Sequence, residues 1–202
     1  MQKLIADTHT HSIASDHAYS TILENIKAAQ EQGLSYLAMT EHGPAMPDAP
    51  HIWHIRCQWG IPSVCCGVNI LHGVEANIMD SEGGLDVSDS ILAGLEWVIA
   101  SMHGRLFPHT TREEHTKAWL RIACNPLVDV LGNSAQGNFE FDEPKALMAG
   151  SWWRSTTAVS FRVLPVFRGT WKSCACARSW RFRSWSTPIP TLQAISGCLR
   201  VP

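Results

Sequence analysis

The sequence predicts an α/β fold in which parallel strands alternate with helices, as they do in a β/α barrel. Three observations lead to this prediction. Short apolar runs alternate with segments of helical spacing, polar residues follow most of these runs, and the composition (45% hydrophobic, 17% charged) is that of a globular protein. Strands separated by helices pair in parallel through right-handed crossovers. In a barrel of such units, the polar residues would meet at the C-terminal face, where active sites lie.

The elements can be justified in chain order. The apolar run Leu4-Ile5-Ala6 ends at Asp7 and predicts a buried strand that leads to a polar site. Residues 21–32 place apolar side chains at helical spacing and stop at Gly33, which predicts a helix. A second helix is expected over 111–123, because two acidic residues in its first turn suit the helix dipole. Further strands are expected over 36–39, 69–78, 97–102 and 128–131.

The chain changes character near residue 150. Residues 1–150 contain all 18 acidic residues and all ten histidines, whereas residues 151–202 contain neither type. The second part holds eight of the 16 Lys and Arg residues and five of the nine Trp, so its formal charge is +8 against −10 for the first part. We therefore divide the chain into a domain over 1–150, which is a partial barrel, and a basic tail rich in Trp, Arg and Ser over 151–202.

Three interpretations of the tail compete. It is a single-stranded nucleic-acid-binding arm, with Trp stacking on bases and Arg on phosphates, an unusual folded segment, or an out-of-frame translation. Because Trp has only the codon TGG, the shifted frame turns Trp152-Trp153 into a codon GTG for valine. It also permits Asp-Ala-His near 186–189. We expect the out-of-frame reading and a poorly ordered tail.

Two broad classes are excluded by the sequence. No apolar run reaches the roughly 20 residues that a membrane-spanning helix needs, and the N-terminus has no apolar signal core. We therefore expect a cytoplasmic protein with no membrane partner. The net charge of −2 predicts no nucleic-acid partner for the whole chain.

The histidines carry the chemical information. In a strand, His9 and His11 of the segment Asp7-Thr8-His9-Thr10-His11 point the same way and can reach one ion. Imidazole is a common ligand for zinc and also suits manganese and iron. The other candidates, which we expect where strands end, are His17, His42, Glu75 and His103. A carboxylate such as Glu75 can bridge two cations, and multi-metal sites of this kind clamp phosphoryl groups. Against this, an isolated His-x-His pair is common, and the remaining histidines are expected to be surface or core residues.

Four ordered motifs contain most of these candidates: Asp7-Thr8-His9-Thr10-His11-Ser12, Met39-Thr40-Glu41-His42-Gly43, Gly73-Val74-Glu75-Ala76-Asn77-Ile78 and Ala100-Ser101-Met102-His103. Together they resemble the motifs of the PHP family of metal-dependent phosphoesterases, and the resemblance covers residues 1–149. The stretch Asp48-Ala49-Pro50-His51-Ile52-Trp53-His54 resembles the YcdX-like branch of that family, which is related to histidinol-phosphate phosphatases.

The resemblance implies a distorted seven-stranded β/α barrel that holds up to three divalent metal ions, with zinc or manganese as the expected metals. It implies that His9, His11 and Glu75 hold one ion and that Glu75 bridges to a second ion bound by His103. His17 and His42 would hold the third ion. Glu75 and His103 are the expected catalytic residues, and a metal-activated hydroxide would attack the phosphorus of a phosphomonoester.

The chain departs from the family pattern in three places. Glu41 replaces the usual Asp of the second motif. Asn133 stands where the family has a histidine metal ligand, so the second ion should bind less tightly. The family's final Asp-x-His pair is missing, because no Asp or His follows Asp142, and the barrel should be incomplete at its C-terminus.

The sequence thus predicts a PHP-type phosphatase that acts on a small phosphorylated substrate and is active or impaired in this chain. The alternative is a catalytically inactive metal-binding remnant of the family. A homo-oligomer is left open.

Overall fold

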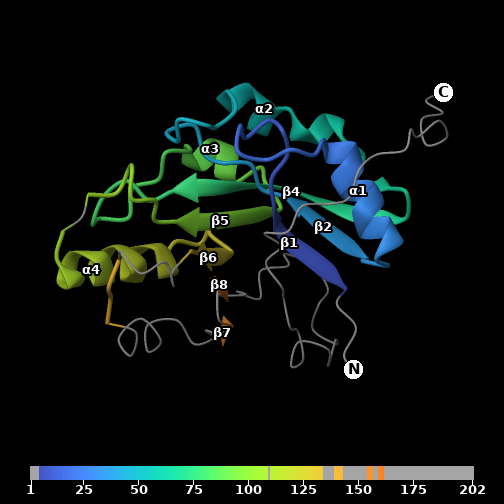
Figure 1. The fold of residues 1–202 in the computed structure, drawn as a ribbon. Coiled ribbons are helices and arrows are strands. Elements are labelled where there is room, and N and C mark those ends of the chain that lie inside the picture. The colour runs from blue at the N-terminus through green and yellow to red at the C-terminus, as the bar shows by residue number, and fades with distance from the viewer. Residues whose placement is uncertain (1–4, 109, 134–138, 143–153, 157–158, 162–202) are drawn as a thin grey trace.

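The computed structural model describes residues 5–108, 110–133, 139–142, 154–156 and 159–161. Its centre is a curled parallel sheet with the strand order β1-β2-β4-β5-β6 (Figure 1). The five strands are β1 (Ala6–Thr10), β2 (Tyr36–Met39), β4 (Val68–Asn77), β5 (Trp97–Ser101) and β6 (Val130–Gly132). A short strand β3 (Val64–Cys65) pairs antiparallel with β4. The predicted α/β class is confirmed. The curled sheet forms a half-barrel, which is consistent with the predicted incomplete β/α barrel.

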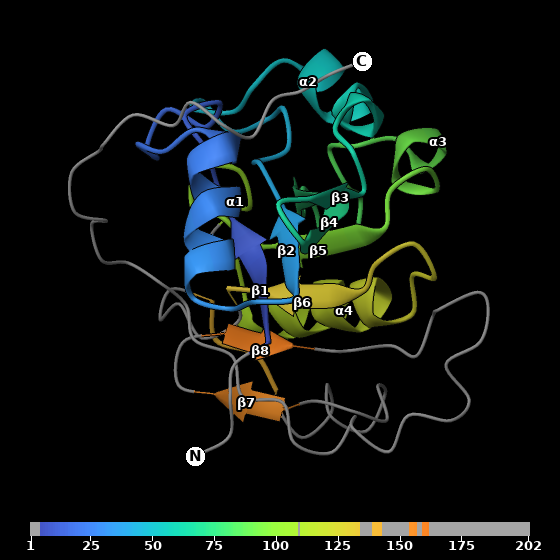
Figure 2. The ribbon, with the colours of Figure 1, turned by 90° about the vertical axis from the view of Figure 1, so that its right-hand side faces the viewer.

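The helices follow the strands as the sequence indicates. Helix α1 (Ile22–Glu31) and helix α4 (Arg112–Ala123) both begin at a threonine that forms a capping box with a glutamate three residues later. Thr21 pairs with Glu24 and Thr111 with Glu114. The two helices pack at opposite ends of the sheet, α1 against β2 and β4 and α4 against β6 (Figure 2). The sequence did not predict the shorter helices α2 (Ile52–Arg56) and α3 (Asp89–Leu92) or the 3₁₀ turn η1 (Gln58–Gly60).

One long-range hydrogen bond connects two non-adjacent strands of the curled sheet. Trp97 on β5 donates from Nε1 to the carbonyl oxygen of Thr8 on β1 at 2.9 Å. These strands are three places apart in the sheet, which is about 14 Å in a flat arrangement. Because an indole cannot span that distance, the sheet must curl, and the side chain bridges its concave side.

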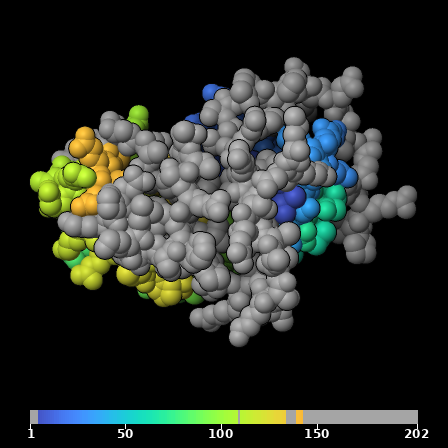
Figure 3. All heavy atoms as spheres, turned by 90° about the horizontal axis from the view of Figure 1, so that it is seen from below, coloured from blue at the N-terminus to red at the C-terminus, as the bar shows by residue number. Residues whose placement is uncertain are grey.

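Two apolar clusters cover the sheet. The larger one joins α4 to β4, β5 and β6 and includes Ala100, Phe107 and Trp119, which are all almost fully buried. The smaller one packs α1 against β2 and the start of β4. Phe139 and its following residues close the larger cluster, and the Asp142 N–H donates to Thr116 Oγ1 on α4 at 2.8 Å. Figure 3 shows the orange atoms of this segment beside the yellow-green atoms of α4.

The described part of the 151–202 tail is a small antiparallel pair, β7 (Arg154–Thr156) with β8 (Val159–Phe161). The rest of the tail, and the prediction that it is poorly ordered, lie outside the described residues. Among the described helices, none combines the length and apolar character that crossing a bilayer requires.

Candidate metal centre

The carboxyl ends of the parallel strands bring most of the candidate ligands together. His9 lies on β1 and His11 directly after it, and their Nε2 atoms are 3.3 Å apart. Both nitrogens face the same carboxylate oxygen, Glu75 Oε2, at 3.2 and 3.3 Å. The His-x-His segment therefore directs both imidazoles to one point, as strand alternation requires.

Glu75 is the centre of the cluster and is fully buried. Its Oε2 also lies 3.0 Å from His42 Nδ1, and its Oε1 lies 3.5 Å from His103 Nε2. One expectation needs correction here: Glu75 is not at the end of its strand, because β4 continues to Asn77. The strand alternation still turns Glu75 into the concave side of the sheet, where the four imidazoles surround it.

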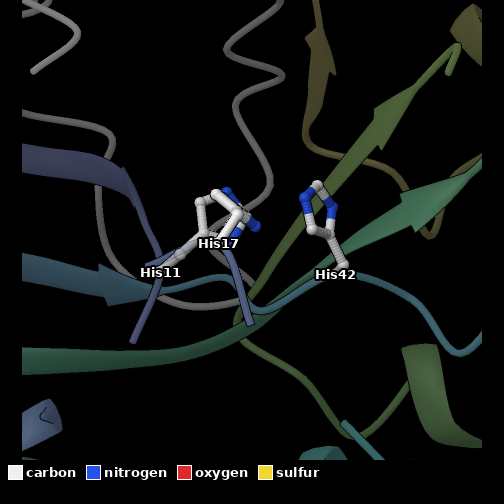
Figure 4. A group of neighbouring side chains, drawn as sticks. All are labelled: His11, His17 and His42. Atoms are coloured by element: carbon white, nitrogen blue, oxygen red, sulfur yellow. The ribbon is translucent and has the colours of Figure 1, made fainter. Parts of the chain in front are cut away.

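A third group combines His11, His17 and His42 (Figure 4). The His11 and His42 ring centroids are 4.5 Å apart, and the His17 ring lies 5.0 Å from each of them. His17 comes from the loop after β1 and not from a strand end, which corrects a second expectation. Its Nδ1 lies 2.6 Å from Asp48 Oδ2, so the carboxylate orients the ring and leaves Nε2 for a ligand.

The loop that carries His11 and His17 is fixed by Glu41. This buried carboxylate accepts hydrogen bonds from the Ser12 N–H at 3.0 Å, from Ser12 Oγ at 2.5 Å and from Ser15 Oγ at 2.7 Å. Glu41 therefore lies behind the cluster and supports the loop. The departure from Asp at this position is accommodated because two serine hydroxyls meet the longer side chain.

His103 is oriented by a polar chain that the sequence did not predict. Its Nδ1 lies 2.6 Å from Asn77 Oδ1. The Asn77 amide in turn donates from Nδ2 to Asp86 Oδ2 at 2.5 Å and to the Gly43 carbonyl at 3.1 Å. The sequence assigned no role to Asn77, although it lies in one of the motifs, or to Asp86, because a buried amide and a loop aspartate have no spacing that marks them as supports of a ligand.

Asn133 follows β6 and has a positive φ of 55°, which asparagine tolerates. Its Nδ2 donates to Glu75 Oε1 at 2.8 Å and lies 3.2 Å from His103 Nε2. The structure thus places Asn133 beside both expected catalytic residues. Its amide hydrogens, and not its oxygen, face the cluster.

The donor set suits divalent cations. Three groups, each with its donor atoms within 4.8 Å of one another, are formed by His9/His11/Glu75, His11/His17/His42 and His42/Glu75/His103. Two buried atoms at their centre, Glu75 Oε2 and His42 Nδ1, have no hydrogen-bond partner although they are 3.0 Å apart. Both residues are members of two of the groups that could hold a cation. Buried polar atoms without partners are costly, and a metal ion would satisfy them.

The electrostatics of the cluster are dominated by the single carboxylate. Burial opposes the ionisation of Glu75, but His9 and the other surrounding imidazoles hold the pKa of this carboxyl well below its usual range. Burial alone would lower the pKa of His9, yet Glu75 raises it. Burial lowers the pKa of His11, which favours its neutral, metal-binding form. The cluster therefore combines a carboxylate that is held ionised with at least one imidazole, that of His11, that is held neutral.

The remaining described histidines lie outside the cluster. His115 is buried against Phe107 and Phe139 and contacts the Glu140 carbonyl through Nδ1 at 3.0 Å. His72 bridges Glu96 and the Ile61 carbonyl. The expected position of an Asp-x-His pair in a shifted frame, near 186–189, lies outside the described residues.

Comparison with known proteins gives a consistent result. The model of the family described as PHP domain matches residues 7–149. A protein named probable phosphatase from Photobacterium profundum is 45% identical over 140 residues, which cover 69% of this chain and 57% of that protein. One of the same name from Thermoanaerobacter sp. strain X514 is 47% identical over 148 residues, covering 73% and 60%. The chain thus matches about three fifths of the length of these relatives.

Proposed function

Because this chain belongs to the PHP domain family, we propose that it derives from a metal-dependent phosphatase that hydrolyses small phosphomonoesters. One observation carries the proposal: a fully buried, ionised Glu75 is surrounded by four imidazoles, and atoms at their meeting point lack partners. The names of the relatives, probable phosphatase, support the reaction class.

The proposed ligands divide between the two faces of the cluster. His9, His11 and Glu75 would hold one cation, and His17 and His42 would hold another together with His11. His103 completes the remaining group with His42 and Glu75, and Asn133 borders that group. Zinc or manganese would suit these ligands. Bound cations would supply the Lewis acidity and the acidified water that phosphate-ester hydrolysis needs.

The chain's own residues prepare this site in three ways. Glu75 provides the negative charge that concentrates cations, and Ser101 Oγ holds its Oε1 in place at 2.6 Å. Asn77 keeps the proton of His103 on Nδ1, so that Nε2 faces the cluster as an acceptor. Asp48 does the same for His17. These contacts fix ligand orientation before any ion arrives, which is the preorganisation that catalysis by charge requires.

The proposal is tested by turnover of p-nitrophenyl phosphate with added manganese or zinc. We expect hydrolysis that requires the metal and is abolished in Glu75→Ala and His9→Ala. Glu31→Ala, which changes an exposed glutamate on α1, is the matched control. Activity in Glu75→Ala equal to that of the wild type would refute the assignment of the site.

A second candidate is a metal-binding remnant without catalysis. The observation that favours it is Asn133, which replaces a ligating imidazole next to Glu75 and His103. Under this alternative the chain binds zinc in a Glu75-dependent way but does not release p-nitrophenol at any metal concentration.

A further inference from the structure

The two oxygens of the Glu75 carboxylate have opposite environments. Oε1 accepts hydrogen bonds from Ser101 Oγ at 2.6 Å and from Asn133 Nδ2 at 2.8 Å. Oε2 accepts none and is buried. Since a carboxylate oxygen has two lone-pair positions in its plane, Oε1 is already satisfied by the protein, whereas Oε2 is available for a cation.

The orientation of the Asn133 amide follows from its neighbours. Asp86 can only accept, so Asn77 must donate to it from Nδ2 and keep its Oδ1 as an acceptor. His103 must then donate from Nδ1 to Asn77 Oδ1, which leaves a lone pair on His103 Nε2. Both atoms that face Asn133, Glu75 Oε1 and His103 Nε2, are therefore acceptors. They select the NH₂ group of the amide and not its oxygen.

The supply of ligand atoms points in the same direction. The three groups share members, because His11, His42 and Glu75 each belong to two of them. Five imidazoles with one nitrogen each and two carboxylate oxygens make seven donor atoms, fewer than the nine that three separate groups of three would use. When Glu75 Oε1 and His103 Nε2 are hydrogen-bonded, five donor atoms remain, so the described residues can serve two such ions only because His11 belongs to both of the remaining groups.

We infer that the Asn133 amide takes the place of a cation in the His42/Glu75/His103 group, so that this chain holds a two-ion centre. This inference rests on the proposed metal-dependent function. It assigns Asn133 the role of an internal competitor of the metal and replaces the expectation that it is a weak ligand. The two interpretations make opposite predictions when the side chain is removed.

The test is the zinc content of the full chain at buffered free zinc, measured by elemental analysis after equilibrium dialysis. Asn133→Gly removes the amide without strain, since glycine accepts the positive φ at this position. We expect Asn133→Gly to bind one more zinc ion per chain than the wild type. This additional ion should reach half-occupancy in Asn133→Gly at a free zinc concentration about tenfold lower than the wild type would need, because the hydrogen bonds of the Asn133 amide no longer compete with it. Asn133→His, which restores an imidazole, should also gain the ion.

Asn69→Gly is the matched control. Its amide donates to the Ser35 carbonyl at the other end of β4, so its zinc content should equal that of the wild type. If Asn133→Gly binds less zinc than the wild type, the amide is a ligand and the inference is wrong. Equal zinc in both proteins also overturns it while leaving the proposed function intact. If neither protein binds zinc, the inference and the proposed metal centre fail together.

Discussion

Asp86 holds Asn77 twice, accepting a hydrogen bond from its backbone N–H at 2.7 Å and another from its side-chain Nδ2 at 2.5 Å. The other carboxylate contact is the Ala45 N–H at 2.9 Å. Through Asn77, this loop aspartate fixes the ring of His103, which it does not touch. The orientation of a candidate ligand therefore depends on a residue two contacts away.

Asp86→Asn should weaken the metal centre without removing a ligand. The neutral amide cannot accept as strongly, and one of its own N–H groups would face the donors of Asn77 and Ala45. Because residues that orient metal ligands typically contribute 10- to 100-fold in affinity, we expect a loss of about that size for the additional zinc ion that Asn133→Gly gains at His103. The measurement compares Asn133→Gly with and without Asp86→Asn, by competition with a chromogenic chelator. Asp89→Asn, at an exposed position on α3, should have no effect. An unchanged zinc affinity on introducing Asp86→Asn would mean that the position of His103 does not depend on the hydrogen bonds from Asp86 through Asn77.

Zinc should stabilise the folded protein through Glu75. Cations that bind only the folded state raise its stability by about 2.7 kcal/mol at a hundredfold excess over Kd. We therefore expect zinc to raise Tm by several degrees and a chelator to reverse the rise. In Glu75→Gln the rise should be clearly smaller, because only the His11/His17/His42 group keeps all its ligands, whereas Glu31→Gln should keep the full rise. The measurement is a thermal melt followed by circular dichroism, and a Glu75→Gln protein that responds to zinc like the wild type would contradict the prediction.

Gly132 leaves no room for a side chain beneath the cluster. A Cβ there would lie 2.3 Å from Ser101 Oγ and 2.6 Å from Ile99 Cγ2. Gly132→Ala should therefore push Ser101 away from Glu75 and destabilise the fold by about 1–3 kcal/mol, as overpacking does. Gly60→Ala is the control, because a Cβ at that position meets nothing within 4 Å. Denaturant unfolding of both variants checks the prediction, which fails if the two midpoints agree.

Asp129 makes the stability depend on pH. Burial raises the pKa of Asp129 to about 6, from an ordinary value of 3.8, while its hydrogen bond from the Val98 N–H opposes the shift. Because the folded state binds this proton more tightly, the group favours folding at low pH, and this contribution is lost as pH rises through about 6.

Asp129→Asn should therefore stabilise the protein above pH 7 by about 2 kcal/mol, a value reduced for the partial exposure of the group. Its Oδ1 can still accept from Val98. Near pH 4 the gain should disappear. Asp16→Asn, at an exposed loop position, provides the control for urea unfolding at both pH values. A gain that is the same at pH 4 and pH 8 would rule out the proposed linkage.

The basic tail leads to a prediction about the coding DNA. If the tail is out of frame, a base should be lost or gained in the DNA near codon 150, compared with a coding sequence that keeps one reading frame throughout. Restoring the frame should yield valine at the codons of Trp152-Trp153 and an Asp-Ala-His near 186–189. Resequencing from codon 145 to the stop decides this, and an unaltered frame would leave the tail as a genuine part of the chain.

Much of the fold could be predicted from local patterns. The helix at α4 was located to within a residue, because Thr111 and Glu114 mark its start, and the long strand β4 was located equally well. The convergence of His9, His11, His42 and His103 followed from their places near strand ends. The supporting roles of Asn77, Asp86 and Ser101 could not be predicted, because they depend on contacts between strands and loops that spacing does not encode. His115 illustrates the converse, since its burial between two phenylalanines depends on a segment 25 residues away.

The strand order has a consequence for synthesis on the ribosome. Neighbouring parallel strands are also consecutive parallel strands in the sequence, from β1 through β2, β4 and β5 to β6, so each can dock on the preceding one as it emerges. A domain generally folds as a unit, and its N-terminal residues are synthesised first. His9, His11, His17 and His42 therefore leave the ribosome before Glu75, and His103 follows. The histidines of the first two strands have no carboxylate partner of the cluster until β4 has been synthesised, so the centre can be completed only after that strand is added.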